Sequence, residues 1–211
     1  MNQIALPLDI SSSSERGGYL IADCNAEVHA QLENWKLWPH KTAILIGPKS
    51  SGKTAMAEQF VKKTGGLILD DADQEAAETI FHLWNRAVAD QKPLLLTATR
   101  PVIKWNIALA DLRSRLAASL LITLGPPDEM MIEGLLQQYF AKRSLSISEE
   151  TIMFLSKRIE RSYENIELLA RKMNIIALER KKPITLTIAK AALSAISGDH
   201  ESEDDTEEFD F

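Results

Sequence analysis

The sequence predicts an α/β protein, in which helices cover both faces of a parallel β-sheet and a small all-helical domain follows. Three observations lead to this prediction. Apolar runs without polar alternation recur through the first 125 residues, and segments with helical spacing separate them. A glycine-rich loop joins the first of these runs to a helix. From Pro126-Pro127 onward the pattern is purely helical.

The elements of the sheet domain follow in a regular order. The expected strands are residues 43–46, 67–69, 93–97 and 120–124. A helix with Val28, Leu32 and Trp35 on one face precedes the first strand. Further helices are expected over residues 55–63 and 74–88. This alternation of strands and helices favours a parallel sheet that is buried on both faces.

The helical domain contains four expected helices. Asp128 and Ser148 are good N-caps for the first two, and the others cover about residues 163–180 and 187–196. We therefore expect a flexible segment at 1–16, the sheet domain at 17–125, the helical domain at 126–197 and a disordered acidic tail at 198–211.

The glycine-rich loop fits the pattern G-x-x-x-x-G-K-[ST] at every constrained position. In such loops, backbone N–H groups surround phosphates, the lysine reaches the terminal phosphates and the last hydroxyl binds Mg²⁺. The loop predicts binding of ADP or ATP with Mg²⁺, through Gly47, Pro48, Lys49, Ser50, Ser51, Gly52, Lys53 and Thr54.

Polar residues end the second and third strands. We expect Asp70 to hold Mg²⁺ together with Thr54, and Asp71 to orient or deprotonate a water molecule. The alternative is a turn, because Asp-Asp-Ala-Asp is also good loop chemistry. Thr99, after the third strand, is a candidate sensor of the terminal phosphate, although a turn before Pro101 explains it equally well.

The charge of the chain is distributed unevenly. The net charge is −6, yet the last thirteen residues hold eight acidic side chains and no basic one. The remainder has 24 basic and 22 acidic residues and no basic stripe, so we expect no strong direct DNA binding. No apolar run could span a membrane and no signal peptide is evident, so we expect a cytoplasmic protein without a membrane partner.

The order of these pieces resembles the AAA+ ATPases, and among them the DnaA-related Hda family of replication regulators. The likeness spans residues 17–197 and includes the phosphate loop, the strand ends at 67–71 and 96–101, the segment 111–116 and the helical lid. It implies that Tyr19, Leu20 and Ile21 line the adenine pocket. It also implies that Arg115 is an arginine finger, which acts in trans on a nucleotide held by another subunit.

The chain departs from the family in two places. Sixteen residues separate Lys53 from Asp70, too few for the usual intervening strand and helix. Either the sheet is one βα unit short, which we favour, or residues 67–69 are the intervening strand and the Mg²⁺-binding strand is missing. In the lid, Glu164 or Asn165 replaces the family's nucleotide-contacting arginine, with Arg161 one turn earlier. Both departures predict that the chain's own ATPase activity is weak or absent.

The N-terminus contains the pattern Q-x-x-L-P-L, which resembles the peptide that binds the bacterial sliding clamp. The residues concerned are Gln3, Ile4, Leu6, Pro7 and Leu8. The proline preorganises an extended peptide, and the leucines suit an apolar groove. The alternative is an unremarkable apolar N-terminus.

The family resemblance and the N-terminal peptide together imply a regulatory adaptor. It would bind the DNA-loaded clamp (the polymerase III β subunit) and stimulate hydrolysis of DnaA-bound ATP, which would limit replication initiation. The family implies a bacterial cytosolic protein that reaches the nucleoid through the clamp and is a monomer or weak homodimer. Two alternatives stay open: an independent ATPase of the helicase-loader type, and an interaction module that its nucleotide merely stabilises.

Overall fold

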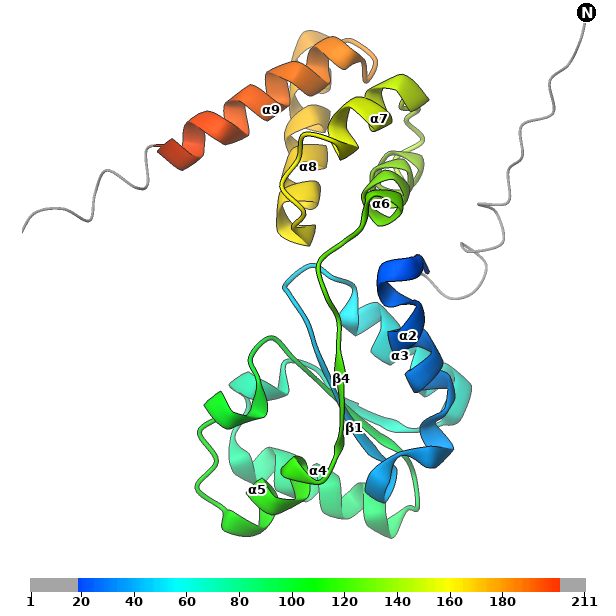
Figure 1. Cartoon of the computed structure of the whole chain (residues 1–211), viewed down its shortest axis with the longest axis vertical. Coiled ribbons are helices and arrows are strands. Elements are labelled where there is room, and N and C mark those ends of the chain that lie inside the picture. Colours follow the sequence, from blue (N-terminus) through cyan, green and yellow to red (C-terminus); the bar gives the residue numbers. More distant parts are fainter. Residues whose placement is uncertain (1–18, 202–211) are drawn as a thin grey trace, which may run out of the picture. The chain divides into compact units, whose positions relative to one another are not determined.

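The structure is a computed structural model that describes residues 19–201, with side chains described as far as Ile196. It divides into two units, of which the first ends at Gly125 and the second begins at Pro126 (Figure 1). The expected clamp-binding residues 3–8 and the end of the acidic tail, residues 202–211, lie outside the described part.

The first unit contains a four-stranded parallel sheet. Its strands are β1 (Thr42–Ile46), β2 (Leu67–Leu69), β3 (Leu94–Ala98) and β4 (Leu120–Thr123). Their order across the sheet is β2-β3-β1-β4, so β1 lies between β3 and β4. Only Gly65 and Gly66 separate the helix after the phosphate loop from β2, and β2 pairs directly with β3. The described sheet therefore has no strand between the phosphate loop and β2.

Helices cover both faces of the sheet, as the uninterrupted apolar strands predict. Residues Ala43 and Leu45 of β1 pack with α2 (Asp23–Glu33) and α3 (Lys53–Thr64). The alternate residues Ile44 and Ile46 pack with α4 (Ala77–Ala89) and α5 (Ala110–Ala117) on the other face. Figure 1 shows the two pairs of helices on opposite sides of the sheet. Alternation along the strands thus divides the core into two layers.

Two segments differ from the expectation. Residues Ala72–Gln74 form a short 3-10 helix, η3, and α4 begins only at Ala77 rather than at 74. The segment 111–116 was not among the expected helices, but it lies within the helix α5, which buries Leu112 and Leu116. One pair of leucines at i and i+4 was too weak a pattern to indicate a helix of eight residues.

The described residues of the second unit form helices and connecting loops, without a strand. The helices are α6 (Glu129–Ala141), α7 (Glu149–Ser156), α8 (Tyr163–Arg180) and α9 (Leu186–Glu201). The expected N-caps are confirmed, since Asp128 accepts from the Met131 backbone N–H over 2.7 Å and Ser148 from that of Thr151 over 3.3 Å. One buried core joins these helices, and it contains Leu136, Phe140, Leu155, Leu169 and Met173. In the part of the chain that is described, no helix is both long and apolar enough to cross a membrane.

Candidate nucleotide-binding site

The carboxyl ends of three neighbouring strands carry the expected site residues. The phosphate loop follows β1, Asp70 and Asp71 follow β2, and Thr99 follows β3. Because the strands are parallel and adjacent in the order β2-β3-β1, these ends meet at one edge of the sheet. The topology therefore brings the predicted nucleotide and metal residues together.

The phosphate loop turns sharply between β1 and α3. Gly52 is the N-cap of α3 and has a φ of 86°, a left-handed conformation that a residue without Cβ adopts easily. Ser50 is also left-handed, with a φ of 57°. The Ser51 hydroxyl donates to the Pro48 carbonyl over 2.7 Å, which closes the loop on itself. This arrangement presents the N-terminus of a twelve-residue helix, where the helix dipole favours anions.

Lys53 lies inside the loop. Its Nζ donates to the carbonyl oxygens of Gly47 over 3.0 Å and Pro48 over 2.8 Å. Burial lowers the pKa of the Lys53 ammonium, while the nearby carboxylates, that of Asp71 most strongly, act in the opposite direction. The ammonium thus carries a burial cost that an anion bound in the loop would reduce.

Thr54 connects the phosphate loop to β2. Its Oγ1 donates to Asp70 Oδ2 over 2.6 Å, and the other carboxylate oxygen, Oδ1, accepts from the buried hydroxyl of Thr97. The two residues expected to hold Mg²⁺ therefore lie in direct contact. This contact supports the view that β2 is the Mg²⁺-binding strand and that the sheet is one βα unit short.

The donor set fits Mg²⁺. A threonine hydroxyl and a carboxylate are hard oxygen ligands, and Mg²⁺ at nucleotide sites takes one or two protein ligands together with phosphate oxygens and water. Among residues 19–201 no group of three or more His, Cys, Asp or Glu side chains could form a metal site by itself. Thr54 and Asp70 are thus a partial site that the phosphates of a nucleotide would complete.

Thr97 is a site residue that the sequence did not single out. Besides donating to Asp70, its Oγ1 accepts from the Asp71 backbone N–H over 3.1 Å. Thr99, the expected sensor, lies two residues farther on in the loop and is half-buried. Both threonines belong to the same polar run, and only the pairing of β2 with β3 decides which of them faces Asp70.

Asp73 is the second residue that sequence reasoning missed. The pattern Asp-Asp-Ala-Asp is compatible with a simple turn, but the Asp73 side chain is 1% exposed and forms an ion pair with Arg100 Nε at 3.0 Å. Burial alone would raise the pKa of Asp73, yet hydrogen bonds from Arg100 and from the backbone outweigh it and lower the pKa below its usual value. Asp73 is therefore a buried, charged link between the loops after β2 and β3.

The segment expected to line the adenine pocket is held against α2. The Asn25 side chain donates to the Leu20 carbonyl and accepts from the Ala22 backbone N–H, both over 2.8 Å. Tyr19 Oη lies 2.7 Å from His29 Nδ1, and burial followed by the charge of Glu33 raises the pKa of Tyr19 to about 12.

The cavity beside Tyr19 is small. It measures about 20 Å³ and lies between α2 and α3, where Leu32, Met56 and Phe60 also line it. A space of this size holds about one water molecule, not a nucleobase. The adenine-binding role of Tyr19, Leu20 and Ile21 stays a prediction.

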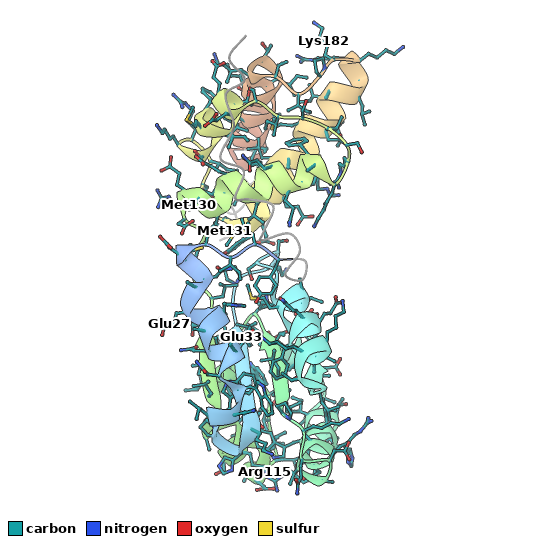
Figure 2. All side chains as sticks on the ribbon, turned by 90° about the vertical axis from the view of Figure 1, so that its right-hand side faces the viewer. Glu27, Glu33, Arg115, Met130, Met131 and Lys182 are labelled. Atoms are coloured by element: carbon teal, nitrogen blue, oxygen red, sulfur yellow. The ribbon has the colours of Figure 1, made fainter. Side chains whose placement is uncertain are left out.

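Arg115 lies at the opposite end of the first unit from the phosphate loop. It belongs to the last turn of α5, and the next element, β4, begins at Leu120, which pairs with Ala43 at the start of β1. The phosphate loop begins beyond the other end of β1, at Gly47, roughly 13 Å away along the strand direction. Figure 2 shows Arg115 at the lower end of the first unit.

Three neighbours hold the Arg115 guanidinium. It pairs with Asp111 through Nη2 at 2.7 Å, donates from Nη1 to Asn85 Oδ1 over 3.0 Å, and its Cζ lies 5.3 Å from the centre of the Phe81 ring. The side chain is 32% exposed. Arg115 is therefore oriented by α4 and α5 and still reachable from solvent.

Comparison with curated proteins shows similarity to a replication initiator. No family model matches the chain. The chain is 29% identical over 134 residues to the chromosomal replication initiator protein DnaA of Nautilia profundicola, covering 60% of this chain and 30% of that protein. It is 28% identical over 138 residues to DnaA of Chloroflexus aurantiacus, covering 63% and 29%. The chain thus spans less than a third of the length of these relatives.

Solved structures show the same fold. Domain III of the Thermotoga maritima initiation protein DnaA superposes with a TM-score of 0.69 at 16% identity, over 90% of this chain and 98% of that domain. A DnaA structure with AMPPCP and single-stranded DNA gives 0.58 at 16% identity, over 77% and 66%. The Thermotoga maritima RuvB motor gives 0.57 at 14%, over 82% and 68%. The fold prediction is confirmed: the chain has the α/β fold of DnaA domain III, and its sequence is similar to that of DnaA at low identity.

Proposed function

We propose that this protein is a nucleotide-binding regulatory adaptor that stimulates hydrolysis of DnaA-bound ATP at the DNA-loaded sliding clamp. Its action would limit repeated initiation of replication in the bacterial cytosol, and the clamp would bring it to the nucleoid. The observation that carries the proposal is the position of Arg115 in a DnaA-like fold. This arginine is held at the end of the sheet opposite the chain's own phosphate loop.

The chain's own nucleotide would be ADP or ATP with Mg²⁺. Lys53 and the loop N–H groups would hold the phosphates, and Thr54 and Asp70 would hold the metal, which would neutralise phosphate charge. Two observations support this assignment: the Thr54–Asp70 contact of 2.6 Å and the buried ammonium of Lys53. In addition, one similar structure is a DnaA with bound AMPPCP. The two departures from the family favour slow hydrolysis or none.

Arg115 would act on the partner's nucleotide. An arginine in this position cannot reach its own phosphate loop, but its guanidinium can neutralise the charge that develops when a neighbour's ATP is cleaved. The ion pair with Asp111 and the hydrogen bond to Asn85 hold the guanidinium in one orientation. Less side-chain entropy is then lost on forming an interface with DnaA.

The clamp assignment rests on the sequence pattern of Gln3, Leu6, Pro7 and Leu8, which lies outside the described residues. An adaptor with one free AAA+ face for its partner would be a monomer or a weak homodimer.

The contact between Thr54 and Asp70 also favours one alternative, in which the chain is itself an ATPase of the loader type with Asp71 activating water. That alternative requires hydrolysis in the absence of clamp and DnaA.

The test uses labelled ATP prebound to DnaA, with the clamp loaded on DNA. We expect the wild-type chain to accelerate hydrolysis. The Gln3→Ala/Leu6→Ala/Leu8→Ala variant should lose this effect when the clamp is limiting. The Arg115→Ala variant should lose it at any clamp concentration, whereas Arg113→Ala, on the same helix and exposed, should keep it. If the wild-type chain does not accelerate hydrolysis of DnaA-bound ATP, the adaptor proposal is refuted. ATP cleavage by this chain in the absence of clamp and DnaA would support the alternative of an ATPase of the loader type.

A further inference from the structure

The loops after β2 and β3 are joined at a point that the proposed function does not use. The Asp73 carboxylate, on the β2 side, accepts from the backbone N–H groups of Thr99 over 3.3 Å and Arg100 over 3.2 Å. It also accepts from Arg100 Nε over 3.0 Å, and Arg100 Nη2 donates back to the Asp73 carbonyl. One carboxylate thus binds both the backbone and the side chain of the neighbouring loop.

This junction lies directly beside the expected metal site. Asp70 is three residues before Asp73, and Thr97, which donates to Asp70, is two residues before Thr99. The segment after β2 is therefore held at two places: by Thr97 near the end of β3, which contacts Asp70 and Asp71, and by Arg100 in the following loop, which pairs with Asp73. A change at the second connection would alter the geometry of the first.

The strand that carries Asp70 depends on this support. β2 has only three residues, lies at the edge of the sheet and pairs with β3 alone. A divalent cation would pull on Asp70, and so short an edge strand has few hydrogen bonds of its own to hold it in place. The link from Asp73 to the loop after β3 supplies the missing restraint.

Arg100 is itself fixed from a third direction. Its carbonyl accepts from the indole N–H of Trp105 over 2.7 Å, and Trp105 is buried. Its guanidinium is about half exposed and borders a groove of about 680 Å³, which Asp73, Glu75 and Lys104 also line. Arg100 is therefore accessible, and changing it leaves the buried apolar core intact.

We propose that Asp73 is a positioning residue of the Mg²⁺-nucleotide site, with Arg100 as its counter-ion. It holds the loop after β2 so that the Asp70 carboxylate stays against Thr54. This inference rests on the proposed nucleotide binding. Residues that orient a metal ligand commonly change metal affinity about 10-fold or more when they are removed.

The test measures binding of N-methylanthraniloyl-ADP to the full chain with Mg²⁺ and with EDTA. For wild type we expect Mg²⁺ to tighten binding. For Asp73→Asn and Arg100→Gln we expect this Mg²⁺-dependent gain to fall about 10-fold, while the affinity in EDTA stays within about twofold of wild type. Arg100→Lys, which keeps a cation beside Asp73, should recover most of the gain. Glu75→Gln, exposed in the same groove, should behave as wild type.

Each outcome separates this inference from the proposed function. If wild type does not bind the probe, or Lys53→Ala binds it as tightly, the nucleotide site itself is refuted. If wild type binds without any Mg²⁺ gain, or if both variants keep the full gain and are only less heat-stable, the positioning role of Asp73 is refuted. If Asp73→Asn does not fold, Arg100→Gln decides the question, because its side chain is about half exposed.

Discussion

The hydroxyl of Thr54 donates to the Asp70 carboxylate over 2.6 Å, although the two residues are sixteen positions apart. The contact joins the first turn of α3 to the end of β2, and it brings together the two residues that are predicted to hold Mg²⁺. Because β2 follows α3 after only two glycines, a shortened AAA+ sheet still places its carboxylate beside the phosphate loop.

Thr54→Val tests this contact. The change keeps the shape of the side chain and removes the hydroxyl, so we expect the Mg²⁺-dependent binding of N-methylanthraniloyl-ADP to weaken by at least about 10-fold. Thr54→Ser, which keeps a hydroxyl, should stay close to wild type. Titrations with and without EDTA separate loss of the metal from loss of the nucleotide. Equal Mg²⁺ dependence in the valine and serine variants would contradict the assignment.

Asp73→Asn should lower the stability of the first unit by about 2 kcal/mol at pH 7, because hydrogen bonds to a buried charge are lost. The folded-state pKa of Asp73 is lowered, so its contribution is complete above the unfolded pKa of about 3.9 and is lost as the pH falls through the folded value. The difference between wild type and variant should therefore shrink below about pH 4.

Urea unfolding followed by tryptophan fluorescence measures this difference, since all four tryptophans lie at positions 35 to 105 and report on the first unit. Glu75→Gln serves as a control that should show little difference at either pH. A wild-type advantage that stays constant between pH 7 and pH 3 would show that the Asp73 carboxylate is not its source.

Much of the fold could be predicted from the sequence because the signals are local. Four apolar runs and one glycine-rich loop indicate the parallel sheet, and Asp128 and Ser148 mark helix starts that the structure confirms. Local patterns also place Thr54 just after the phosphate loop that follows β1 and Asp70 directly after β2, so both lie at the carboxyl ends of the parallel strands. Their contact also depends on the order of the strands, which places only β3 between β2 and β1.

The remaining features depend on partners that are distant in the sequence. Asp73 becomes a buried ion-pair residue only because Arg100, 27 positions later, lies in the loop beside it, and the same link accompanies the 3-10 helix η3 where α4 was expected to begin. Helix α5 is short, and its two leucines become informative only when β1, β3 and α4 supply the core against which they pack. No local pattern contains either fact.

Arg115→Ala should abolish most of the stimulation of DnaA-bound ATP hydrolysis, by about 10³-fold, which is the lower range for removal of an arginine finger. Arg115→Lys should not restore it, because a lysine lacks the planar fork of donors. The chain's own nucleotide affinity should not change, since Arg115 lies at the far end of the strands from the phosphate loop. Its partly exposed ion pair with Asp111 contributes less than about 1 kcal/mol to stability.

Radiolabelled hydrolysis assays with limiting chain give the rate, and Arg113→Ala is the matched control on the same helix. An Arg115→Ala variant that stimulates as well as wild type would show that Arg115 is only an intramolecular contact of α4 and α5. A variant that fails to bind DnaA at all would show an interface role in place of a catalytic one.

Gly66→Ala should destabilise the first unit by about 2–3 kcal/mol, the upper range for overpacking. A Cβ at this position would lie 2.7 Å from the Pro93 carbonyl oxygen and 2.9 Å from Phe60 Cε1. The carbonyl cannot move away easily, because it accepts the Leu67 backbone N–H over 2.8 Å at the start of β2. The strand that carries Asp70 would have to shift as a whole.

The neighbouring Gly65 provides the contrast. It is the C-cap of α3 with a φ of 67°, and a Cβ there would meet no atom within 4 Å. Asparagine tolerates this left-handed conformation, so Gly65→Asn should cost less than about 1 kcal/mol. Urea midpoints read by tryptophan fluorescence compare the two variants directly. Equal stability of the two variants would contradict the prediction. It would show that the close contact of Gly66 with the Pro93 carbonyl and Phe60 does not determine where β2 begins.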